Sequence, residues 1–113
     1  MTLKELMEAA DRRNEARYPV CSVWDPMDWA GAMAGEAGEC VNKAKKLRFC
    51  GEWDDRIGQL RDDVVAEACD TIWYALILMK QLGVKDPELE MKRVFNEVSR
   101  RNGWPDSFPA HGE

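Results

Sequence analysis

The chain has 113 residues, the usual length of one domain, so we predict a single domain over residues 1–113. With 45% hydrophobic and 33% charged residues it has the composition of a folded protein, which excludes disordered and fibrous classes. Its net charge of -5 opposes electrostatic binding to the phosphate backbone of a nucleic acid, so we expect no nucleic-acid polymer as a partner. The excess of carboxylates leaves binding of divalent cations open.

Cysteine spacing and hydropathy indicate the cellular compartment in which we expect the protein. The four cysteines form no CxxC pair, and the single histidine, His111, lies in the tail, so a zinc site is not expected. The N-terminus lacks an apolar signal core, and the longest apolar run, residues 72–79, is too short to cross a bilayer. We therefore expect a cytoplasmic protein with reduced thiols and no membrane partner.

The first half of the chain predicts two helices. Thr2 and Glu5 have the spacing of a capping box, and apolar residues then recur at helical intervals, which predicts a helix over residues 3–17. After a short connector, Asp25 supplies an N-cap and the next residue is a proline, which favours the first helical position. A long second helix is expected over residues 26–49.

The second half predicts two more helices. Residues 62–82 are the strongest helical segment, and the spacing of Ile57 and Leu60 leaves an earlier start open. Asp86 followed by proline repeats the cap of the second helix and predicts a fourth helix over residues 87–102.

These elements define the expected fold class. No segment alternates apolar and polar residues over the length of a strand, so the protein is predicted to be all-α. Four helices in so short a chain suggest a small four-helix bundle-like protomer. Because the chain carries five Trp and six Met, we expect its remaining apolar faces to be completed by oligomerisation, as a homodimer or homotetramer.

Two carboxylates on the second helix are candidates for a functional site. Glu36 and Glu39 are three residues apart and share one helix face. Two glycines flank them, and because glycine weakens a helix, their presence suggests that another helix or a ligand approaches closely. Lys43 and Lys46 follow, so the same face passes from acidic to basic and suits a metal with the phosphates that it bridges.

A second acidic pair lies on the third helix. Glu67, Asp70 and Tyr74 belong to a polar stripe on a helix that is otherwise largely apolar. Buried carboxylates are normally protonated, paired with a cation or bound to metal. If the two acidic pairs face each other, Glu36, Glu39, Glu67 and Asp70 supply hard oxygen ligands of the kind that suit Mg²⁺, with Mn²⁺ as the other candidate.

Each feature also has a purely structural interpretation. Either acidic pair alone is common on a solvated helix, the lysines can serve the helix dipole, and Tyr74 can be a core residue with its hydroxyl at the rim. A di-iron carboxylate bundle is set aside because it needs histidines on facing helices, and the predicted helices contain none. Only the two acidic pairs together favour a metal site.

The same residues resemble the MazG-like members of the all-α nucleoside triphosphate pyrophosphohydrolase superfamily. The resemblance covers most of the chain and rests on residues 34–39, Asn42, Lys45 with Lys46, residues 67–70, Tyr74 and residues 95–99. The position before the Phe-Asn pair is often basic in that family and is Val94 here.

The resemblance implies an activity and assigns roles. It implies Mg²⁺-dependent hydrolysis of a nucleoside triphosphate to a monophosphate and pyrophosphate, with Glu36, Glu39, Glu67 and Asp70 as metal ligands. Glu36 or Glu39 is the preferred general base. It also implies contacts from Lys43 or Lys46 and from Asn96 to the phosphates or sugar, and Tyr74 is placed with them in the substrate site.

A different class of function stays open. A chain that keeps this fold without turnover would be a non-catalytic helical nucleotide-binding module or a protein-interaction module. In that case the acidic residues are structural, and Mg²⁺ leaves thermal stability unchanged.

Overall fold

The computed structural model describes residues 1–109 and is all helical over that range. His111 and the end of the tail lie outside the described residues. The elements, in chain order, are α1 (Leu3–Arg17), the 3-10 helix η1 (Pro19–Val23), α2 (Pro26–Arg48), α3 (Ile57–Gln81) and α4 (Pro87–Asn102). The predicted all-α class and its four helices are confirmed.

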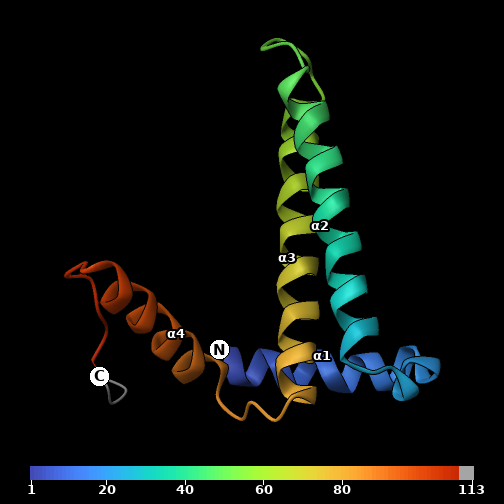
Figure 1. Cartoon of the computed structure of the whole chain (residues 1–113). Helices are drawn as coiled ribbons and strands as arrows, with labels where there is room; N and C mark the ends of the chain where they lie inside the picture. Colours follow the sequence, from blue (N-terminus) through green and yellow to red (C-terminus); the bar gives the residue numbers. More distant parts are fainter. Residues whose placement is uncertain (110–113) are drawn as a thin grey trace.

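Helices α2 and α3 form a long antiparallel hairpin, with its closing loop at one end and α1 across the other end (Figure 1). Helix α1 packs on α3 and η1, and α4 adjoins α1 and otherwise leads away from the hairpin (Figure 1). The Leu3 amide donates a 2.7 Å hydrogen bond to the Glu88 carboxylate, which ties the start of α1 to the start of α4. The four helices are thus arranged as a hairpin, a helix across its base and one outlying helix.

The helix starts follow the capping signals in the sequence. The Thr2 hydroxyl accepts a 3.0 Å hydrogen bond from the Glu5 amide, and Asp25 accepts an equally long bond from the Asp28 amide. Both contacts belong to reciprocal capping boxes, which satisfy amides that a helix start leaves without a partner. The predicted starts of α1 and α2 are therefore confirmed.

One helix boundary and one connector differ in detail from the simplest prediction. Helix α3 starts at Ile57 rather than at residue 62, which confirms the earlier start that the apolar spacing left open. The connector between α1 and α2 contains the 3-10 helix, because a proline at its start fixes a helical φ. Helix α4 ends at Asn102, as predicted, and Gly103 after it has a φ of 69°, a left-handed conformation that favours glycine.

The core lies where the base of the hairpin meets α1. It contains Ala10, Cys21, Trp29 and Ile77, and the rings of Trp24 and Trp29 meet edge to face with centroids 4.7 Å apart. At its margin the Lys80 ammonium lies 3.1 Å from the Asp11 carboxylate, which links α3 to α1. Burial therefore fixes α1, η1, α2 and α3 to one another at this end of the molecule.

Much apolar surface stays uncovered away from this core. The radius of gyration is 17.2 Å, whereas a compact chain of this length has about 13 Å. Val65 and Ile72 lie two turns apart on one face of α3 and are 61% and 51% exposed.

Among the described residues, no helix combines the length and hydropathy needed to cross a membrane.

We predict that Met7→Ala destabilises the protein far more than Met27→Ala. Met7 is 2% exposed and Met27 82%, so only the first substitution leaves a cavity. A buried Met→Ala change costs about 2–5 kcal/mol, and an exposed one about 0.5 kcal/mol or less. Chemical denaturation of the two variants checks this, and equal losses would contradict the burial of α1 on the hairpin.

Candidate functional site

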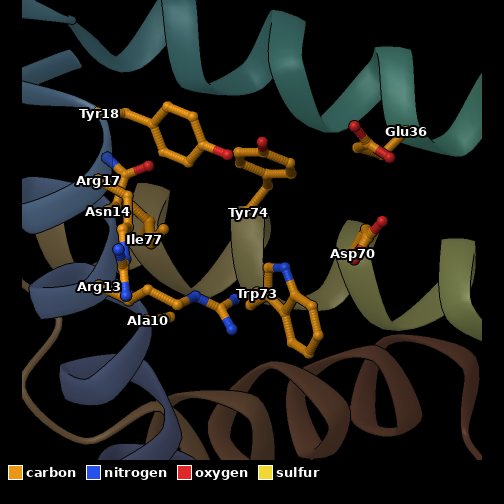
Figure 2. A pocket seen from close by; sticks show the side chains of 10 residues that line it. All are labelled: Ala10, Arg13, Asn14, Arg17, Tyr18, Glu36, Asp70, Trp73, Tyr74 and Ile77. Atoms are coloured by element: carbon orange, nitrogen blue, oxygen red, sulfur yellow. The ribbon is translucent and has the colours of Figure 1, made fainter. Parts of the chain in front are cut away.

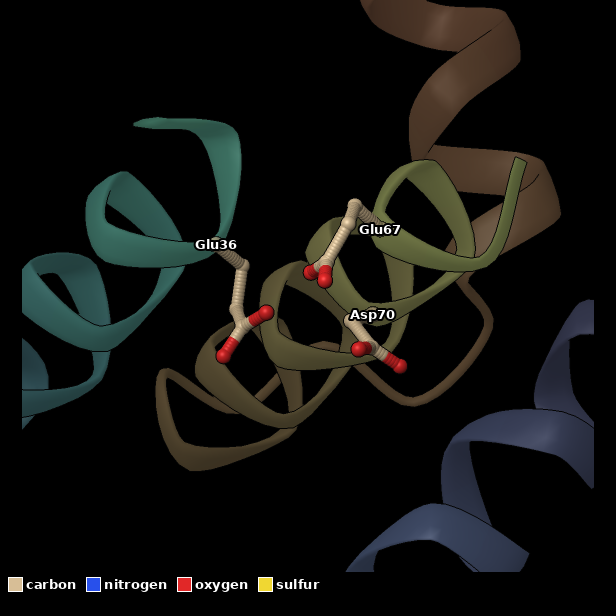
Figure 3. Close-up of side chains that lie close together, drawn as sticks. All are labelled: Glu36, Glu67 and Asp70. Atoms are coloured by element: carbon tan, nitrogen blue, oxygen red, sulfur yellow. The ribbon is translucent and has the colours of Figure 1, made fainter. Parts of the chain in front are cut away.

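Three carboxylates from two helices meet in the middle of the hairpin. Glu36 of α2 faces Glu67 and Asp70 of α3 (Figure 3), and each offers an oxygen that lies within 4.8 Å of the others. All three side chains are partly buried. The antiparallel pairing of the helices produces this group, because Glu67 and Asp70 stand one turn apart on the face of α3 toward α2.

The fourth predicted ligand, Glu39, stands outside this group. It lies one turn after Glu36 on α2 and is exposed, whereas the acidic group consists of Glu36, Glu67 and Asp70. Its charge is still close enough to act on Glu36. One protomer therefore brings together three of the four predicted carboxylates.

The flanking glycines do not serve helix packing within the chain. A Cβ atom placed on Gly35 or Gly38 would have no neighbouring atom within 4 Å. No helix of the chain approaches them closely within residues 1–109, so the expected close approach of another helix or a ligand stays a prediction. The two helices pair through a different side of α2, where the Cys40 thiol lies 3.8 Å from the Val64 carbonyl oxygen.

Partial burial and the crowding of like charges together raise the pKa of Glu36 above its ordinary value. Partial burial is the largest cause, followed by a hydrogen bond with Glu67 and by repulsion from Asp70, Glu67 and Glu39. The pKa of Tyr74 is raised as well, first by burial and then by the charges of Glu36 and Asp70. Both shifts mark the acidic group as a place where added positive charge is favourable.

A cavity of about 390 Å³ adjoins this group, between α1 and the hairpin (Figure 2). Glu36 and Asp70 contribute acidic side chains to it, and Tyr74 places its ring between the helices (Figure 2). Helix α1 contributes two guanidinium groups. The lining residues are Ala10, Arg13, Asn14, Arg17, Tyr18, Glu36, Asp70, Trp73, Tyr74 and Ile77.

The basic side of the cavity was not predicted from the sequence. Arg13 and Arg17 lie one turn apart on α1, and the Arg13 guanidinium stands 5.0 Å from the centroid of the Trp73 ring. Within residues 1–109 neither arginine forms an ion pair. Their spacing of four residues is the one signal in the sequence, and such a spacing is common on solvated helices. The two arginines face the acidic group only because α1 crosses the base of the hairpin.

The predicted substrate residues are placed differently from one another. Tyr74 lines the cavity beside Glu36 and Asp70, and its contact with a substrate stays a prediction. Lys43 and Lys46 lie farther along α2 toward the hairpin loop and do not line it. One chain therefore brings only Tyr74 of these three to the cavity.

Asn96 lies on α4 and is not brought to the cavity within one chain. Its side-chain amide donates a 3.0 Å hydrogen bond to the Phe108 carbonyl oxygen, and its oxygen accepts a 2.8 Å bond from the Phe108 amide. Phe95 and Phe108 meet edge to face beside it, with ring centroids 5.0 Å apart. Within the protomer, Asn96 thus holds the segment after α4 in place.

Comparison with known proteins finds no matching family model, no matching curated protein and no matching solved structure. The resemblance to MazG-like proteins therefore stays a prediction from the motifs.

We predict that Mg²⁺ or Mn²⁺ raises the melting temperature of the protein. A cation that binds only the native state stabilises it by about 3 kcal/mol at a hundred times its Kd. Asp70→Asn should remove most of this increment, since one of three oxygen ligands is lost, whereas Glu52→Gln in the exposed loop should keep it. Differential scanning fluorimetry over a cation titration measures this. The same titration of Glu39→Gln tests whether Glu39 is a fourth ligand.

The raised pKa of Glu36 predicts a pH dependence in the cation-free protein. A carboxyl whose pKa is raised on folding stabilises the native state below its ordinary pKa of 4.5, and this contribution is lost as pH rises through the raised value. Glu36→Gln should therefore melt above the wild type at pH 7, and the gap should close toward pH 4.5. A gap independent of pH would contradict the charge crowding.

Proposed function

We propose that the protein is a Mg²⁺-dependent nucleoside triphosphate pyrophosphohydrolase. It would act in nucleotide metabolism in the cytoplasm and convert a ribo- or deoxyribonucleoside triphosphate and water to a monophosphate and pyrophosphate. The observation that carries the proposal is the cavity with acidic groups on the hairpin side and guanidinium groups on the α1 side. Carboxylates suit the metal and guanidinium groups suit the phosphate oxygens, and this cavity has both kinds of group.

The acidic group fits a divalent cation of this kind. Glu36, Glu67 and Asp70 offer only oxygen ligands, which suit Mg²⁺ and Mn²⁺ better than softer metals. When bound, such a cation supplies neutralisation of phosphate charge and a lowered pKa of water. The resemblance to MazG-like enzymes agrees with this chemistry.

The residues of the chain then have distinct tasks in the reaction. Water attacks the α-phosphorus, the bond to the bridging oxygen breaks, and pyrophosphate leaves with that oxygen. Glu36 is the preferred general base, because its carboxylate lines the cavity whereas Glu39 does not, and an oxygen of Glu36 accepts the proton of the water. Tyr74 lines the cavity beside Glu36 and packs against the core, which places its ring at the substrate.

A homo-oligomer is part of the proposal. The exposed apolar face of α3, with Val65 and Ile72, and the open shape of the protomer both favour a second copy that covers the hairpin. The flat side of α2 at Gly35 and Gly38 is open to such a copy as well.

Phosphorus NMR tests the reaction. Purified protein with Mg²⁺ and a panel of triphosphates should release pyrophosphate and a monophosphate, and the ranking of substrates gives the preferred base. Glu67→Gln should abolish turnover with the helical circular dichroism signal kept, whereas Glu52→Gln should leave turnover intact. If no triphosphate is turned over and Mg²⁺ has no effect on stability, the interaction-module hypothesis replaces the proposal.

Sedimentation equilibrium tests the oligomer. We expect a dimer or tetramer for the wild type and a shift toward monomer for Ile72→Glu, because a buried charge without a partner opposes association. Glu52→Gln serves as the control in the exposed loop. A wild type that stays monomeric at high concentration would contradict this part of the proposal.

A further inference from the structure

We propose that Arg13 and Arg17 bind the phosphate chain of the substrate, so that the site selects compounds with two or more linked phosphates. This inference rests on the proposed function and assigns to α1 a task that the sequence motifs gave to Lys43 and Lys46. It makes α1 the element that recognises the phosphate chain, whereas the hairpin provides the acidic groups.

The geometry of the cavity carries the first step. Arg13 and Arg17 are one turn apart on α1, and both line the cavity that Glu36 and Asp70 line from the hairpin (Figure 2). Asn14 adds a side-chain amide to the same wall. An extended ligand in this cavity therefore has acidic groups near one end and guanidinium groups near the other.

The chemistry of the two walls carries the second step. Phosphates are repelled by the carboxylates and attracted by guanidinium groups, whose paired N–H donors match two oxygens of one phosphate. Two arginines one turn apart suit two phosphate groups in succession, whereas a single orthophosphate engages only part of the pair. Discrimination by the number of phosphates follows from this spacing.

The ion pairs of the protein carry the third step. Arg56, Arg93 and Arg100 are held by neighbouring carboxylates, with N···O distances of 2.8, 2.5 and 2.6 Å respectively. Arg13 and Arg17 have no such partner within residues 1–109. Their donors are therefore free for an anion, and the ring of Trp73 orients the guanidinium of Arg13 without occupying its edge.

The alternative phosphate ligands are less well placed. Lys43 and Lys46 follow Glu39 on α2, on the part of the hairpin that leads toward its loop, and neither lines the cavity. A phosphate chain bound by these lysines would have to lie along the hairpin, outside the cavity. The position of α1 thus favours the arginines.

The test uses tripolyphosphate and orthophosphate as probes, measured by isothermal titration calorimetry on the full chain without divalent cation. We expect tripolyphosphate to bind more tightly than orthophosphate, and Arg17→Gln to weaken it about tenfold or more, as for the loss of a charged hydrogen bond. Arg13→Gln should act in the same direction. Arg12→Gln is the matched control, since it makes the same change on the same helix at a position that does not line the cavity.

The outcomes separate this inference from the proposed function. Loss of tripolyphosphate binding in Arg17→Gln but not in Arg12→Gln supports the inference even if no nucleotide is hydrolysed. Turnover of a triphosphate with the same KM and the same tripolyphosphate affinity in all three variants overturns it and leaves the proposed function standing. If Arg13→Gln unfolds because the contact with Trp73 is lost, Arg17→Gln alone decides, because within residues 1–109 no aromatic ring stacks on Arg17.

Discussion

The antiparallel pairing of α2 and α3 is the constraint on which the rest of the structure depends. It places Glu36 opposite Glu67 and Asp70, and partial burial together with the resulting repulsion raises the pKa of Glu36. Such crowding of carboxylates opposes folding unless a cation binds between them. The pairing of α2 and α3 therefore produces both the hairpin and a group of side chains that attracts cations. The hairpin tolerates this because its main core lies at the base, away from the acids.

Helix α1 makes that group one side of a cavity that is partly open to solvent. Its buried residues Met7 and Ala10 fix it across the base of the hairpin, and the salt bridge between Asp11 and Lys80 adds a polar tie. Farther along the same side of the helix, Arg13 and Arg17 line the cavity together with Ala10. Buried apolar residues and cavity-lining arginines thus follow one another along one side of a short helix, and a shift of its register would separate the two walls.

The candidate site was predictable in part. The spacing of Glu67 and Asp70 on a largely apolar helix indicated a buried acidic pair, and Glu36 was recognised by its partner three residues on. Helical periodicity predicts Glu36 and Glu39 equally as metal ligands, because both lie on one broad face of α2. It predicts no role for Arg13. Asn96 was assigned through the family resemblance, and in the protomer its amide holds the Phe108 backbone instead.

The sequence by itself determined the helical class, the four helices and most of their ends, because capping side chains, prolines and apolar periodicity act within a few residues of one another. Only the tertiary structure decided which carboxylates meet and which cations face them. Those contacts join residues that are dozens of positions apart, and they depend on how α2 turns against α3 and where α1 crosses the hairpin. Local pattern does not specify these angles, since they are set by the packing of a few buried side chains around Trp29 and Ile77.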